Sequence, residues 1–157
     1  MLLTQYLIET FSFNDQMNRK VLERVRHLQD KSYAIRLFSH LINCQLRWMA
    51  RIKQDGDAAK MSWWEPVYEL DELEVQWTRS LQPWFDYINS TNDADLTTEV
   101  TFVDTGGHLF AATPGDIALQ LNYHSIHHRA QIQTIIRQQG QIPDFVDFVG
   151  TKYRKLN

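Results

Sequence analysis

The sequence predicts an all-α fold, an antiparallel four-helix bundle with a small β-hairpin before the last long helix. Four long stretches of the 157-residue chain repeat apolar residues every three or four positions, the spacing of one helical face. Residues 98–103 and 108–112 are instead short β-prone segments joined by Asp-Thr-Gly-Gly, a sequence typical of a hairpin. The length is that of one domain with a substantial core, so we expect residues 1–157 to form a single domain.

The first helix is expected over residues 3–29, with a possible interruption near Phe13. Asn14 and Asn18 are four residues apart and therefore share one face of this helix. Their amides can cap a break or form hydrogen bonds inside a bundle. We expect at least one of the two to be exposed to solvent.

The second helix is expected over residues 32–53, with Ser32 as N-cap and Gly56 as the stop. Apolar residues form rows on two of its sides, which predicts a central helix covered on two faces. His40 lies at the border of the main row and is the only histidine of this helix. It is either a metal ligand or a partly exposed polar residue beside Arg36 and Asn43.

The third helix is expected over residues 70–88 as a single kinked helix, because its apolar row keeps phase through Pro83. The connector before it contains the adjacent Trp63 and Trp64. Such a pair usually covers the edge of a core and less often lines a ligand cleft.

The last helix has the clearest boundaries. Thr113 as N-cap, Pro114 at the first helical position and Asp116 in the first turn form a strong start signal, and Gly140 ends the helix. The apolar tail after residue 144 is expected to fold back on the helices.

Two histidines of the last helix occupy positions where the apolar row calls for Leu or Ile. His124 and His128 lie roughly 6 Å apart along the helix axis, so both can reach one metal ion. A shared ion would satisfy one nitrogen on each buried ring. The spacing alone leaves two interpretations open, a metal pair and two packed core residues, and His40 is the leading candidate for a third ligand.

Composition excludes several classes of protein. With 16 Lys plus Arg against 19 Asp plus Glu, the chain lacks the positive charge that non-specific nucleic-acid binding requires. No apolar run reaches the length of a membrane span, and no basic region followed by an apolar segment starts the chain. The single Cys44 suits a reducing compartment. We therefore expect a cytoplasmic protein that binds neither nucleic acid nor membrane.

Several of these motifs together resemble the DinB/YfiT-like family of metalloenzymes. They are Phe-Asn-x-x-x-Asn in the first helix, His40 followed by Trp48, the hairpin, and His-x-x-His-His-Arg-x-Gln starting at His124. The resemblance covers nearly the whole chain and implies a four-helix bundle with a long crossover. It also implies three histidines that bind a divalent metal, zinc or nickel, which fall on His40, His124 and His128. Gln16 departs from the family, where many relatives have Trp.

The resemblance further implies a small-molecule substrate and one of two reactions. Some relatives are similar to S-transferases that use a low-molecular-weight thiol such as bacillithiol or mycothiol, and others are described as hydrolases. The last helix has no Glu or Asp between its two ligand histidines, which removes the obvious general base for water, so we rank thiol transfer above hydrolysis. His127 and Arg129 are candidates for supporting the site from outside the ligand set.

Three function classes remain open. The chain is an enzyme, a metal-binding or sensing protein without turnover, or a structural bundle in which the histidines are core residues. An enzyme is expected to keep an open coordination position on a three-histidine site. Family habit and the apolar area outside the metal cleft also predict a homodimer.

Overall fold

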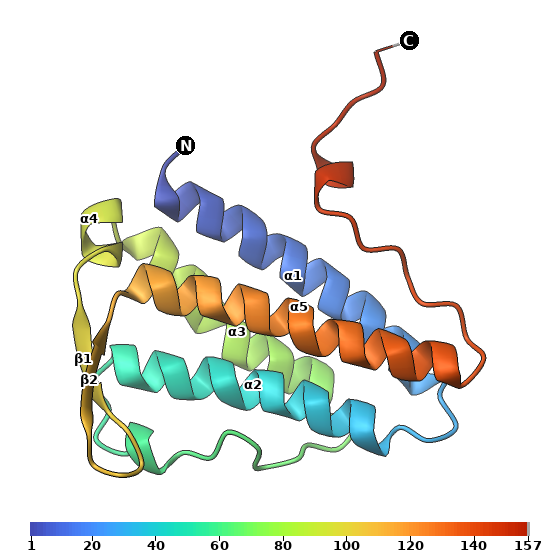
Figure 1. Ribbon diagram of the computed structural model, residues 1–157, viewed down its shortest axis with the longest axis horizontal. Helices are drawn as coiled ribbons and strands as arrows, with labels where there is room; N and C mark the ends of the chain where they lie inside the picture. The colour runs from blue at the N-terminus through green and yellow to red at the C-terminus, as the bar shows by residue number, and fades with distance from the viewer. Residues whose placement is uncertain (157) are drawn as a thin grey trace.

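The structure is a computed structural model that describes residues 1–156. It is mostly helical, with a two-stranded hairpin directly before the last long helix (Figure 1). In chain order the elements are α1 (Leu3–Arg26), α2 (Ser32–Ile52), a 3-10 turn (Ala58–Lys60), α3 (Leu73–Ser90), α4 (Asp93–Leu96), β1 (Val100–Val103), β2 (Leu109–Ala112), α5 (Pro114–Gln138) and a second 3-10 turn (Val149–Thr151).

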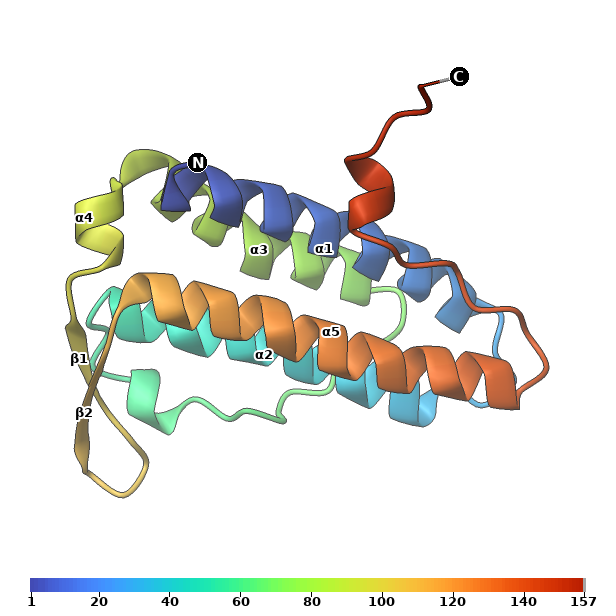
Figure 2. The same ribbon diagram turned by 45° about the horizontal axis from the view of Figure 1, so that its top comes forward.

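Helices α1 and α5 lie side by side and run in the same direction (Figures 1 and 2). Asn14 donates a hydrogen bond to Asn122, and Asn18 donates one to Ser125, so contacts follow the same order along both helices. The chain reaches this arrangement because α5 starts at the same end of the molecule as α1, next to α4 and the hairpin (Figure 1).

Helices α2 and α3 are also parallel neighbours. Phe38 packs on Trp77, and Gln45 accepts a hydrogen bond from Ser80 further along both helices. The segment 53–72 makes this possible, because it returns along most of α2 before α3 begins (Figure 2). The expected antiparallel arrangement therefore holds for α1 with α3 and for α2 with α5, whereas the other two neighbouring pairs are parallel.

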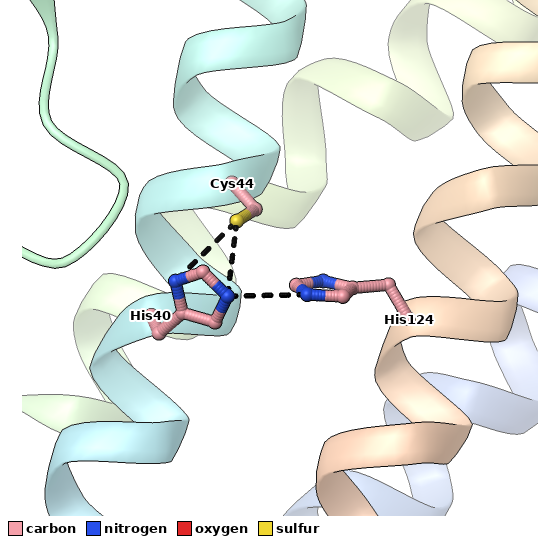
Figure 3. A group of neighbouring side chains, drawn as sticks. All are labelled: His40, Cys44 and His124. Carbon is pink, nitrogen blue, oxygen red and sulfur yellow. Dashed lines mark hydrogen bonds between the residues drawn. The ribbon is translucent and has the colours of Figure 1, made fainter.

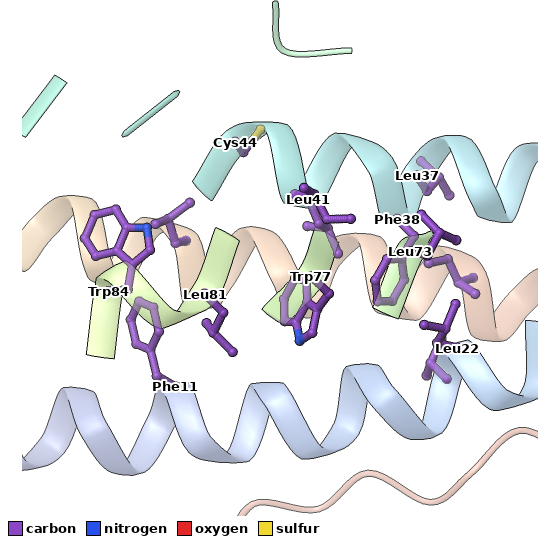
Figure 4. Packing of buried hydrophobic residues seen from close by; sticks show 14 of the residues in the cluster. Phe11, Leu22, Leu37, Phe38, Leu41, Cys44, Leu73, Trp77, Leu81 and Trp84 are labelled. Carbon is purple, nitrogen blue, oxygen red and sulfur yellow. The ribbon is translucent and has the colours of Figure 1, made fainter. Parts of the chain in front are cut away.

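One apolar core lies between the four long helices (Figure 4). Its largest members are Trp77 and Trp84 of α3, which are 1% and 0% exposed. Phe11 of α1 stacks on Trp84 with 5.9 Å between ring centroids, which joins α1 to α3 across the core. No helix in the described part of the chain is both long and apolar enough to cross a membrane.

Helix α1 is continuous, so the predicted interruption near Phe13 is wrong. Asn14 and Asn18 are both buried, which also contradicts the expected exposure of at least one of them. Their amides form hydrogen bonds with polar side chains of α5 and leave the α1 backbone intact.

Helix α2 begins as predicted, but with a different cap. Ser32 is the first helical residue, and Lys31 is the N-cap, without a side-chain cap hydrogen bond. Asp30, just before it, accepts hydrogen bonds from the backbone N–H and the hydroxyl of Ser32. Helix α3 continues through Pro83 as one helix, as expected.

The start of α5 matches the sequence prediction. The Thr113 hydroxyl accepts a hydrogen bond from the Asp116 backbone N–H at 3.1 Å and donates one to the Asp116 carboxylate at 2.7 Å. The acid also lies at the positive end of the helix dipole. Because α5 carries two of the candidate ligands, this cap fixes the end of the helix that leads into the site.

Replacing Thr113 by alanine is expected to lower the free energy of unfolding by about 1 kcal/mol, because the cap bond to an otherwise unpaired N–H is lost. Urea denaturation followed by circular dichroism measures the change. Thr134→Ala, at an exposed position near the C-terminal end of α5, is the matched control and should change stability by less than about 0.5 kcal/mol. Equal effects of the two substitutions would contradict a role for the cap.

The C-terminal tail contacts α1, but it folds back only in part, because Phe145, Val149 and Tyr153 are exposed. Asp144 pairs with Arg24 of α1 at 2.8 Å, and the Phe148 ring packs edge-on against Phe13 with 5.2 Å between centroids. These contacts cover part of the groove between α1 and α5.

Candidate metal centre

Three histidines meet between α2 and α5. His40 lies in the middle of α2, and His124 and His128 lie one turn apart on the side of α5 that faces it. The Nε2 atom of His124 is 3.1 Å from Nε2 of His40 and 2.9 Å from Nε2 of His128. The structure thus brings together all three histidines that the sequence singled out.

The outer nitrogens of two of these rings are fixed by hydrogen-bond acceptors. His40 Nδ1 is 2.6 Å from the backbone carbonyl of Trp63, and His128 Nδ1 is 2.7 Å from the side-chain oxygen of Gln131. Because these oxygens can only accept, the proton of each neutral ring resides on Nδ1. The Nε2 atoms of His40 and His128 therefore present lone pairs to the centre.

This arrangement fits a cation. A neutral His124 has at most one Nε2 proton, so it can donate to His40 or to His128 but not to both. In a tetrahedral site with metal–nitrogen distances near 2.0–2.1 Å, ligand nitrogens are separated by about 3.3 Å. The observed separations of 2.9 and 3.1 Å are close to that value, and the Nδ1 partners are of the kind that orients metal-binding imidazoles.

Burial keeps the three rings neutral. It lowers the pKa of His40 and of His128 below the ordinary value of a histidine, against the opposing effects of the Trp63 carbonyl and Gln131. Burial, reinforced by the neighbouring imidazoles, lowers the pKa of His124 to about 4. A neutral imidazole is the form that binds metal ions.

Cys44 adds a fourth donor that sequence reasoning missed. It lies one turn after His40, with Sγ 3.7 Å from both nitrogens of that ring (Figure 3). The potential ligand atoms of His40, Cys44 and His124 all lie within 4.8 Å of one another, so this group can also hold a metal ion. Burial raises the pKa of the Cys44 thiol to about 12. The His-x-x-x-Cys spacing on α2 was the available signal.

A comparison with protein-family models matches residues 15–132 to the DinB superfamily. The chain belongs to this superfamily. The matched segment contains His40, Cys44, His124 and His128. No curated protein and no solved structure matches the chain in the corresponding comparisons.

In this DinB protein the tryptophans of the connector form part of the site. Trp64 stacks on His40 with 3.8 Å between ring centroids and 10° between ring planes. Trp48 and Trp63 line a cavity of about 220 Å³ that reaches His40 and His124. Of the Trp pair in the connector, Trp63 therefore lines a cleft, the less common of the two roles expected for it, whereas Trp64 covers His40. The cavity can admit a small molecule beside the histidines.

Of the two residues expected to support the DinB site from outside the ligand set, Arg129 contacts α1 instead, whereas His127 contacts a candidate ligand. Arg129 is buried and donates hydrogen bonds to Asn14 and Asn18 of α1, away from the histidines. His127 is exposed, and its ring touches that of His128 with 4.9 Å between centroids. The supporting residue that sequence reasoning missed is Gln131, three positions after His128 on the same helix.

Proposed function

We propose that this DinB protein binds a divalent metal ion, zinc or nickel, through His40, His124 and His128, and uses it for transfer of a low-molecular-weight thiol to a small electrophilic substrate. The observation that carries the proposal is that the three Nε2 atoms converge. Acceptors at Nδ1 of His40 and His128 keep the proton on that nitrogen, so the Nε2 atoms of these two rings present lone pairs. Three protein ligands leave a coordination position open, which is typical of catalytic and not of structural sites.

His128 is preferred over Cys44 as the third ligand. Its Nε2 atom already faces His124 at 2.9 Å, and Gln131 orients the ring. The Cys44 thiol would have to lose its proton to bind an ion, and burial opposes that loss by raising the thiol pKa to about 12. A bound divalent ion held by neutral ligands would lower the pKa of a thiol and so supply a thiolate at neutral pH.

The chain's own groups position this chemistry. The Trp63 carbonyl and Gln131 hold the Nδ1 protons of His40 and His128 and thereby fix the ring orientations. Trp64 covers one face of His40 and limits the access of water. In the reaction, the thiolate sulfur forms a bond to an electrophilic carbon, and the leaving group departs with its bonding electron pair. A reducing cytoplasm, the location that we propose, would maintain such a thiol in its reduced form.

Hydrolysis is the second candidate reaction. Within residues 1–156, no carboxylate forms a hydrogen bond with His40, His124 or His128, so the pocket offers no acidic general base for water. This observation favours thiol transfer over hydrolysis. A metal-binding protein without turnover would share the same ligands, and only an activity measurement separates it from an enzyme.

The test uses protein purified without a polyhistidine tag. Elemental analysis is expected to find about one zinc or nickel ion per chain, and the loaded protein should conjugate a small thiol to a chromogenic electrophile. Cleavage of a chromogenic ester without any thiol dependence would favour the hydrolase. Stoichiometric metal without either reaction would favour a non-catalytic metal-binding protein, and absence of metal would overturn the proposal.

Cys44→Ala separates the two possible ligand sets. If His128 is the third ligand, the substitution should leave metal stoichiometry unchanged and metal affinity within about threefold of the wild-type value, since Cys44 would then contact the His40 ring without binding the ion. Competition with a chromogenic chelator measures the affinity. Loss of the metal in Cys44→Ala, together with its retention in His128→Ala, would assign the site to His40, Cys44 and His124.

We propose that residues 1–157 form one domain, a four-helix bundle with a long crossover. The single core shared by α1, α2, α3 and α5, and the return of the segment 53–72 along α2, support this description.

We also propose that the chain forms a homodimer. Tyr123 and Ile126 of α5 are 63% and 48% exposed and lie on the outer surface near the apolar groove between α1 and α5. Burial of such side chains is a common source of dimer stability. Light scattering at micromolar concentration is expected to give twice the chain mass of 18.6 kDa, and a mass of one chain would remove the proposal.

A further inference from the structure

Two arginines at the C-terminal end of α2 are buried without an acidic partner. Arg47 is 1% exposed and Arg51 is 5% exposed. Neither forms an ion pair within residues 1–156, and the Nε atoms of both are buried without a hydrogen-bond acceptor. Buried guanidinium groups normally pair with a carboxylate or another anion, so this pair requires an explanation.

Aromatic rings cover the faces of both guanidinium groups. Arg47 lies over the Trp63 ring at 4.0 Å, and Arg51 lies 4.6 Å from the ring centroids of both Trp48 and Phe102. Stacking of this kind stabilises a cation through its flat faces. It leaves the N–H groups at the edge of each guanidinium free to donate in the plane of the group.

Those N–H groups are largely unused. Arg47 donates one hydrogen bond, to the Ala59 carbonyl at 3.0 Å, and the Arg51 guanidinium donates none to residues 1–156. Burial, and the positive charge of Arg47, lower the pKa of Arg51, which Asp104 only partly offsets. The Asp104 carboxylate is occupied by the hairpin turn, where it accepts from Gly106 and His108.

Arg51 lines a cavity of about 240 Å³ between the end of α2, the 58–60 turn and the hairpin. Gln54, Gly56, Ala59, Thr101 and Phe102 contribute to its wall. Asp55 also lines it, but one of its carboxylate oxygens already accepts from the Asp57 backbone N–H. The cavity therefore combines a buried, unpaired guanidinium with room for a ligand of several heavy atoms.

We propose that this cavity binds a small oxyanion, a carboxylate or a phosphate, through the Arg51 guanidinium, with Arg47 supplying a second positive charge. A planar guanidinium fork matches the oxygens of either group. The two nearby carboxylates, Asp55 and Asp104, already accept hydrogen bonds from backbone N–H groups, so the N–H groups of Arg51 remain available to an anionic ligand. The site is separate from the candidate metal centre, although Trp63 contacts both: its carbonyl accepts from His40 and its ring covers Arg47. The proposal does not depend on the metal or on thiol transfer.

Thermal unfolding of the wild-type protein with increasing phosphate or succinate at constant ionic strength tests this site. At a ligand concentration about tenfold above Kd, the Tm should rise by about 3–6 °C. Arg51→Met should remove the rise, and calorimetry should show an affinity about ten- to a hundredfold lower. Arg137→Met, at an exposed arginine of α5, is the matched control and should respond like the wild type. The anion that gives the larger rise in Tm shows whether the site prefers a phosphate or a carboxylate.

A second variant excludes binding of the anion to a metal ion. His128→Ala alters the candidate metal centre and is expected to keep the anion-dependent rise in Tm. If Arg51→Met fails to fold, Arg51→Lys serves in its place, because a lysine keeps the charge but loses the bidentate fork, and its affinity should fall at least about tenfold. The proposal is overturned if the wild type shows no rise, if Arg51→Met and Arg51→Lys respond like the wild type, or if His128→Ala abolishes the response.

Discussion

His124→Ala is expected to remove stoichiometric metal and to lower metal affinity by more than about a hundredfold, since loss of a direct ligand should exceed the 10- to 100-fold effect typical of residues that only orient ligands. His124 is the central residue of the cluster, because its Nε2 atom is the one that lies within 3.1 Å of both other Nε2 atoms. Without its ring, His40 and His128 remain on different helices with no donor between them. Thiol transfer should decrease by at least about a hundredfold in parallel with metal content.

His127→Ala is the matched control for this substitution. His127 belongs to the same turn of α5, but it is exposed, and within residues 1–156 its ring forms no hydrogen bond. The variant should retain about one metal ion per chain. Elemental analysis and chelator competition on the two variants provide the comparison, and full occupancy in His124→Ala would show that the histidine cluster is not the metal site.

The two candidate ligands of α5 could be predicted from the sequence because both lie on one helix. A spacing of four residues fixes their relative position whatever the rest of the fold does. His40 was a weaker candidate, since its position next to them depends on the packing of α2 against α5, which no local pattern encodes. Arg129 was misassigned for a local reason. It follows His128 by one residue, a rotation of about 100° around the helix, which directs it towards α1.

Other parts of the site leave no signature in the sequence. The acceptor for His40 is the backbone carbonyl of Trp63, and a backbone group is the same in every residue type. Its position depends on the path of the segment 53–72, which returns along α2 and makes α2 and α3 parallel. The unpaired state of Arg51 is likewise a property of the packed structure, since its solvation and its partners are defined only when the hairpin covers the end of α2.

Burial of Asn14 and Asn18 was missed because polar residues on a helix are usually exposed. The missing information was on another helix: α5 presents Asn122, Ser125 and Arg129 at matching positions along the parallel α1. Polar residues become compatible with a core when each finds its partner. This polar contact joins α1 to α5 on the side of α5 that faces away from the candidate metal ligands.

Asn14→Ala is therefore expected to lower the free energy of unfolding by about 2–4 kcal/mol, because it removes two buried hydrogen bonds, one of them to a charged group. Asn14 donates to the side-chain oxygen of Asn122 at 2.7 Å and accepts from Arg129 at 2.8 Å. Its loss leaves that side-chain oxygen unpaired and leaves Asn18 as the one remaining acceptor for Arg129 within residues 1–156. Urea denaturation measures the change, and Asn89→Ala, at an exposed position of α3, should change stability by less than about 0.5 kcal/mol.

Metal content distinguishes this structural role from a role in the site. Because the Asn14 network and the candidate ligands lie on different sides of α5, folded Asn14→Ala should still bind about one metal ion per chain under conditions that keep it native. A loss of stability below about 1 kcal/mol would show that the network contributes little to the fold. A loss of metal from the folded variant would instead show that the α1–α5 contact is needed to hold His124 and His128 in register with His40.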